Sequence, residues 1–338
     1  MNTALSLSVS NASVLSLPPA PGPRSSAPYL SLVERLSRAS VKKHFDAYAD
    51  VAWDDPDFRI DPADPRWERE PTDPLGSTSW YQALPAKERA RIGLAVVAFQ
   101  MKMGIAFESV LQRGLLELAG TLPNGSPEFR YAYHEVIEEG QHSLMFQEFV
   151  NRSGFDAPGM DGVMAWTARR VPKLGRTFPE LFFLHVLGGE APIDHVQRAE
   201  LRRGDAVHPL QRRLMQIHVT EEARHVCFAD RYLEEHVPHL SALRLLRLRT
   251  LAPFVLRETA ALMLRPPERF CRLLGIPRSV AAEAFGGARY QRLTAEGLRP
   301  VRDLCIRAGI VTPGWVPLWR ALGIWQTPAE EPALEPIS

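Results

Sequence analysis

Two stretches of this chain repeat one spacing of residues that can bind metal ions. Glu108 is followed by Glu139-Gly-Gln-His142, and Glu190 is followed by Glu222-Ala-Arg-His225, with nearly the same gap in both cases. A glutamate on one helix and Glu-x-x-His on the next, twice over, is the ligand set of carboxylate-bridged di-iron and di-manganese sites in four-helix bundles. The repeat therefore predicts a site for two metal ions and indicates oxygen chemistry.

Helix geometry allows these residues to face one another. At about 100° per residue, Glu139 and His142 lie about 60° apart on one face of a helix. His218, Glu222 and His225 fall within a similar arc of a later helix, so all three can point at one site. The predicted metal ligands are Glu108, Glu139, His142, Glu190, His218, Glu222 and His225.

The charge of this ligand set suits a buried redox site. Four carboxylates balance two Fe²⁺ ions when the imidazoles are neutral, and burying a net charge is costly. Oxygen and imidazole donors match iron, or alternatively manganese, better than soft metals. Glu138 and Glu221 each precede a ligand glutamate, and we expect each to accept a hydrogen bond from the histidine of the opposite motif. The alternative is that both are solvent-exposed helix acids.

Small and apolar residues near the predicted ligands indicate where a substrate could lie. Gly104 lies one turn before Glu108, where it leaves room. The predicted pocket residues are Met101, Gly104, Ile105, Leu111, Leu187 and Ile193. Such an apolar pocket would suit an aromatic or acyl-linked substrate, although the same residues would also form an ordinary core.

The elements that must hold these residues are helical. No stretch alternates convincingly with period two, so the sequence predicts an all-α fold, a ferritin-like four-helix bundle core with additional flanking helices. The core helices are expected at about 86–119, 127–152, 179–203 and 209–236, bounded by Pro, Gly and capping residues. Further helices are expected near 163–170, 240–264 and 278–308. The Asp- and Pro-rich stretch 44–76 is expected to be an extended loop.

Length and composition indicate a single domain. Residues 31–325 are expected to form it, with the ligand core at about 86–236, a disordered leader at 1–30 and a flexible tail at 326–338. The 338-residue chain has a net charge of +1, which gives no reason to expect nucleic acid. Its three cysteines form no paired motif, which favours the reducing cytoplasm. The longest candidate for a membrane span, 243–264, contains several charges and a proline, so no membrane partner is expected.

At these residues the chain resembles the AurF-type di-iron N-oxygenases, which include p-aminobenzoate and chloramphenicol-pathway arylamine oxygenases. The resemblance covers about 99–232 and rests on the doubled motif plus His218, four residues before Glu222. Acyl-carrier-protein desaturases and bacterial hydrocarbon monooxygenases share the other six ligands without that histidine. The resemblance implies a homodimer that uses two iron ions and O₂ to oxidise an amine to a hydroxylamine, nitroso or nitro product in natural-product biosynthesis.

Three positions depart from the pattern of that family. The aminobenzoate enzyme carries Tyr and Arg shortly before its first ligand glutamate, where this chain has Gln100 and Met103. This difference argues against p-aminobenzoate itself as the substrate. In the first motif the position that matches His218 is Glu135, so the two metal ions would have unequal ligand sets.

Other functions remain open. A ferritin-like C–H hydroxylase or desaturase would use a similar site, although His218 argues against it. A radical-generating subunit is disfavoured because Phe146 takes the place of its usual tyrosine. A non-catalytic metal-binding bundle would bind metal without consuming O₂ catalytically. The chain has no nucleotide-binding fingerprint, so electrons are expected from an external reductase or ferredoxin, and the small-molecule amine is either free or carrier-bound.

Overall fold

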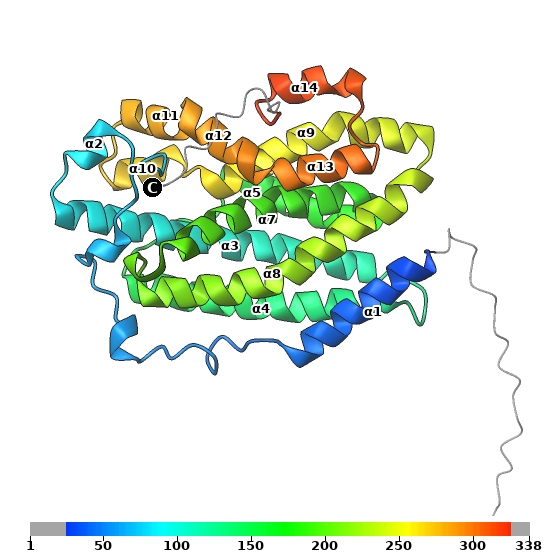
Figure 1. The fold of residues 1–338 in the computed structure, drawn as a ribbon, viewed down its shortest axis with the longest axis horizontal. Coiled ribbons are helices and arrows are strands. Elements are labelled where there is room, and N and C mark those ends of the chain that lie inside the picture. Colours follow the sequence, from blue (N-terminus) through cyan, green and yellow to red (C-terminus); the bar gives the residue numbers. More distant parts are fainter. Residues whose placement is uncertain (1–24, 326–338) are drawn as a thin grey trace, which may run out of the picture.

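The computed structural model describes residues 25–325, and within that range it contains helices and no strands. Four long helices form the core: α3 (Ala86–Ala119), α4 (Pro127–Ser153), α7 (Pro179–Arg202) and α8 (Pro209–His236). α3 packs along α4, and α7 packs along α8, with the four axes roughly aligned (Figure 1). The predicted all-α fold with a ferritin-like four-helix core is confirmed.

Local sequence explains where the core helices begin and end. Ser126 caps α4 by accepting a hydrogen bond from the Glu128 amide, and Pro127 occupies the first turn, where a missing N–H costs nothing. α4 ends at Gly154, whose φ of 73° is a left-handed conformation that glycine adopts readily. His208 caps α8 through a hydrogen bond from the Leu210 amide. These signals place each metal-binding motif in the middle of a continuous helix.

Flanking helices cover the core on several sides. α9 (Ala242–Leu264) packs against α7, and α1 (Ala27–Lys42) lies against α4 and α8 (Figure 1). α12 (Ala288–Gly297) and α13 (Arg299–Arg307) also contact α7. The remaining helices are short: α2 (Ser79–Gln82), α5 (Gly162–Ala168), α6 (Leu174–Thr177), α10 (Glu268–Leu273), α11 (Arg278–Gly286) and α14 (Val316–Ala321).

Two of the expected segments, the leader and the helix at 278–308, differ in the structure. α1 begins at Ala27, inside the expected leader, because Ser26 caps it and donates a hydrogen bond of 2.8 Å to Glu235 of α8. The rest of the predicted leader, residues 1–24, and the predicted tail lie outside the described residues. The single helix expected over 278–308 is instead three helices, which break at Gly287 and again before Pro300, since proline has no N–H to continue a helix.

One described helix, α3, has the length and apolarity of a possible membrane span, whereas the sequence analysis had chosen 243–264 as the longest candidate. In the most apolar window of α3, 72% is buried inside the fold. A core helix of a bundle passes the same test of length and composition. We therefore interpret α3 as the central core helix.

The loop between α1 and α2 is anchored tightly to the bundle. Trp67 is buried, stacks on His208 with ring centroids 4.2 Å apart, and contacts Phe149 edge-on. Its backbone passes so close to α3 that a Cβ atom at Gly93 would lie 1.9 Å from the Trp67 carbonyl oxygen. This contact fixes the chain that immediately follows, including Arg69.

We expect Gly93→Ala to destabilise the fold because the added methyl group cannot be placed without moving the loop backbone. Overpacking of this kind costs about 1–3 kcal/mol. Gly140→Ala is the matched control, since a Cβ atom there meets nothing within 4 Å. It should stabilise helix α4 by about 0.5–1 kcal/mol. Urea denaturation of both variants measures the difference, and equal stabilities would contradict the packing described.

Candidate metal centre

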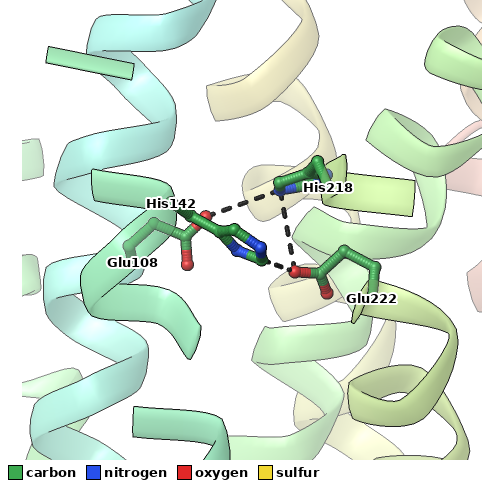
Figure 2. Close-up of side chains that lie close together, drawn as sticks. All are labelled: Glu108, His142, His218 and Glu222. Carbon is green, nitrogen blue, oxygen red and sulfur yellow. Dashed lines mark ion pairs between the residues drawn. The ribbon is translucent and has the colours of Figure 1, made fainter. Parts of the chain in front are cut away.

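The predicted ligands come from all four core helices and converge in the interior of the bundle. Two groups of buried side chains have ligand atoms within 4.8 Å of one another: Glu108, His142, His218 and Glu222 in one, and Glu135, Glu139 and His225 in the other. Figure 2 shows the first group, which α3, α4 and α8 contribute. Glu190 of α7 belongs to neither group. Burial, together with the nearby charge of Glu222, raises the pKa of Glu190 well above its ordinary value. Each group could hold a metal ion.

The histidine of each Glu-x-x-His motif contacts the glutamate that immediately precedes the other motif. The Nε2 atom of His142 lies 2.9 Å from Glu221, and that of His225 lies 2.7 Å from Glu138. The Nδ1 atoms of both rings therefore face the cluster. Glu138 and Glu221 are both buried, and they occupy the hydrogen-bonding positions expected from the sequence rather than a solvent-exposed face. Carboxylate partners of this kind fix the ring orientation and strengthen imidazole as a metal donor.

Residues farther from the cluster hold Glu138 and Glu221 in place. The guanidinium of Arg224 is 2.9 Å from Glu138 and 3.5 Å from Glu221, and it also donates to the Ser40 hydroxyl of α1 at 3.1 Å. The Phe45 amide, just after α1, donates to Glu221 at 3.2 Å. Helix α1 therefore does more than cover the bundle, because it orients the residues that orient the histidines.

His218 has a partner of a different kind. Its Nδ1 atom lies 2.9 Å from the Gln197 side-chain oxygen of α7, and its Nε2 atom is 3.6 Å from carboxylate oxygens of both Glu108 and Glu222. The amide oxygen can only accept, so Nδ1 carries the proton and Nε2 is free to bind a metal ion. A neutral amide polarises the ring less than a carboxylate does. Gln197 was not predicted from the sequence, although it lies two turns after Glu190 on the same helix face.

Burial shifts protonation in the cluster. Desolvation, together with the nearby Glu139 charge, raises the pKa of Glu108 well above its ordinary value. Burial lowers the pKa of His142, but hydrogen bonds to Glu139 and Glu221 outweigh that effect and raise it to about 10. Among the described residues, five buried carboxylate oxygens accept no hydrogen bond. Oε1 of Glu138 lies 2.9 Å from Arg224 and Oε1 of Glu139 lies 2.9 Å from His225, whereas Oε2 of Glu108, Glu135 and Glu222 has no such ion pair. Divalent cations would satisfy these oxygens, and the carboxylate and imidazole donors fit iron or manganese.

Glu135 makes the two halves of the cluster unequal. It takes the place in α4 that His218 takes in α8, as its position in the sequence suggested, and its carboxylate lies in the group with Glu139 and His225. Burial raises its pKa to about 8. One half of the site therefore has an additional carboxylate and the other an additional imidazole.

A narrow cavity of about 40 Å³ opens onto the cluster between α3, α7 and α8. Met101, Gly104 and Ile193 line it, but Ile105, Leu111 and Leu187 are not among its lining residues. Leu111 and Leu187 are part of one hydrophobic core cluster, and Ile105 packs against another. The lining residues that the sequence analysis did not propose include Arg69, Val97, Gln197, Glu200, Gln211, Met215 and Met263.

Comparisons with known proteins identify the family. The family described as "P-aminobenzoate N-oxygenase AurF" matches residues 27–309. Uncharacterized proteins of Mycobacterium bovis and Mycobacterium tuberculosis are 39% identical over 295 residues, which is 87% of this chain and 87% of each relative. The resemblance inferred from the metal-binding motifs is confirmed, and the chain belongs to the AurF family of N-oxygenases.

Proposed function

We propose that this protein is a non-haem di-iron oxygenase that oxidises an amine, in particular an arylamine, to a hydroxylamine, nitroso or nitro product. The observation that carries the proposal is the pair of buried ligand groups beside a cavity in a chain of this family. Two iron ions bound there would supply the site at which O₂ is reduced. Each oxygenation transfers one oxygen atom to nitrogen and reduces the other to water, with two electrons from an external reductant and two protons from solvent.

In this proposal the protein supplies ligands, orientation and exclusion of water. The ligands are the seven predicted residues: Glu108, Glu139, His142, Glu190, His218, Glu222 and His225. Glu138 and Glu221 hold two of the histidines, and Gln197 holds His218. Apolar walls keep water from the reacting nitrogen and position it near the cluster.

Metal binding should stabilise the protein strongly because buried carboxylate oxygens of Glu108, Glu135 and Glu222 have no hydrogen-bond donor among the described residues. Anaerobic Fe²⁺ or Co²⁺ should bind with two ions per chain and add about 2.7 kcal/mol of stability for each site at a metal concentration 100 times the dissociation constant. Thermal denaturation with and without metal, combined with metal analysis, measures this effect. His225→Ala should lose most of it, whereas Glu283→Gln on the exposed face of α11 should retain it. Equal stabilisation of both variants would place the metal elsewhere.

Gln197 should control how firmly the metal ion near His218 is held. Gln197→Leu removes the acceptor for Nδ1–H, so the affinity for that ion should fall about 10-fold or more. Gln197→Glu keeps an acceptor and adds charge, so it should match or exceed the wild-type affinity. Gln211→Leu changes another cavity residue without touching His218 and serves as the control. Competition with a chelator measures the affinities, and identical values for all four proteins would refute this role.

The catalytic proposal is tested by supplying ¹⁸O₂ and a chemical reductant to the iron-loaded protein with a panel of arylamines. We expect hydroxylamine or nitro products whose oxygen derives from ¹⁸O₂, detected by mass spectrometry. Labelled products hydroxylated at carbon would instead support a hydroxylase, and unlabelled products with a new carbon–carbon double bond would support a desaturase. Iron that binds and oxidises once, with no product from any amine, would support the non-catalytic metal-binding bundle.

A further inference from the structure

The cavity beside the cluster runs along the bundle axis. On α3 its lining extends from Glu108 back to Val97, and on α7 from Glu190 forward to Glu200. A rise of 1.5 Å per residue makes these stretches about 17 Å and about 15 Å long. The stretch on α8, from His218 back to Gln211, leads the same way. The cavity is therefore a corridor with the metal ligands at one end and different chemistry at the other.

The end of the corridor away from the cluster contains a buried arginine. Arg69, held by the loop that Trp67 anchors, is 7% exposed and lines the cavity. Its guanidinium is 2.6 Å from Asp73 and 3.8 Å from Glu200. Its Nε atom is buried and has no acceptor among the described residues. An unpaired buried donor costs about 1–3 kcal/mol, so a ligand that offers an acceptor there gains binding energy.

The charges around Arg69 are already balanced. Arg69 and Arg203 carry two positive charges, while Asp73 and Glu200 carry two negative ones, and Glu200 also contacts Arg203. Glu70 pairs with Arg203 as well, but its side chain is 41% exposed, so water screens its charge. A ligand carboxylate would leave a net negative charge in a buried place, which is unfavourable. An uncharged carbonyl oxygen would accept from Arg69 without that cost, and the side-chain amide of Gln100 adds a further neutral polar group.

The walls of the corridor can adapt to a ligand. Three of the lining residues are methionines from three different helices: Met101, Met215 and Met263. Unbranched thioether side chains change rotamer readily and fill irregular spaces. The cavity has a free volume of about 40 Å³. We therefore expect a ligand to enlarge it by moving these side chains rather than the backbone.

From these observations we propose that the substrate is an elongated amine whose end opposite the nitrogen carries an uncharged hydrogen-bond acceptor, such as an amide or ester carbonyl, bound by Arg69. The inference rests on the proposed function for the position of the nitrogen. It specifies the substrate class further, because it excludes amines that end in a free carboxylate and favours those whose acid group is masked.

The test compares two arylamines that differ only in terminal charge, 4-aminohippurate and its neutral amide. Binding to the anaerobic, Fe²⁺-loaded full-length protein is measured by calorimetry, without O₂. We expect the amide to bind at least about tenfold more tightly than the carboxylate. Equal affinities, a preference for the carboxylate, or failure of both compounds to bind would overturn the proposal.

Variants distinguish an effect of charge balance on ligand preference from a general loss of structure. Asp73→Asn and Glu200→Gln each remove one negative charge beside Arg69, so both should shift the preference toward the carboxylate by about tenfold. Arg69→Lys keeps the charge but loses the Nε donor, so it should weaken binding of the amide. Glu70→Gln is the control, because its side chain is 41% exposed and contacts only Arg203. An unchanged preference in both charge variants would also overturn the proposal.

The outcomes distinguish this inference from the function on which it rests. If the amide binds with the expected preference but is never oxidised, the oxygenase proposal fails while recognition by Arg69 stands. If arylamines are oxidised with no preference between the two compounds, the recognition proposal fails while the oxygenase stands.

Discussion

The burial of a carboxylate cluster inside an apolar helical bundle is the constraint on which the rest of this structure depends. Glu108, Glu139, Glu190 and Glu222 are each at most 3% exposed. Even after relaxation, an isolated buried charge costs several kcal/mol, so these groups need protons, imidazoles or cations beside them. The long continuous helices, the buried histidines and the layers outside them all supply that compensation.

Two supporting layers outside the cluster have different roles. On one side, Arg224 and Ser40 connect helix α1 to the glutamates that orient His142 and His225. On the other side, the loop before α2 carries Arg69 to the cavity. Segments distant in sequence from the Glu-x-x-His motifs therefore help to orient the two histidines and line the cavity.

The sequence was most informative where chemistry follows helix periodicity. The spacing of Glu139 and His142, repeated in α8, allowed the fold, the ligands and the pairing of Glu138 and Glu221 with opposite histidines to be predicted. Periodicity gives no information about a loop residue such as Arg69, whose position depends on tertiary contacts. It also cannot tell which face of a fully apolar helix borders a cavity, and for this reason Ile105 and Leu187 were assigned to the pocket although they pack in the core.

The central claim, that these four helices hold two metal ions, is tested most directly by anomalous X-ray diffraction from crystals of the iron-loaded protein. The account predicts two iron peaks, one beside the group that contains His218 and one beside the group that contains Glu135. A single peak, or iron bound away from the bundle interior, would contradict it.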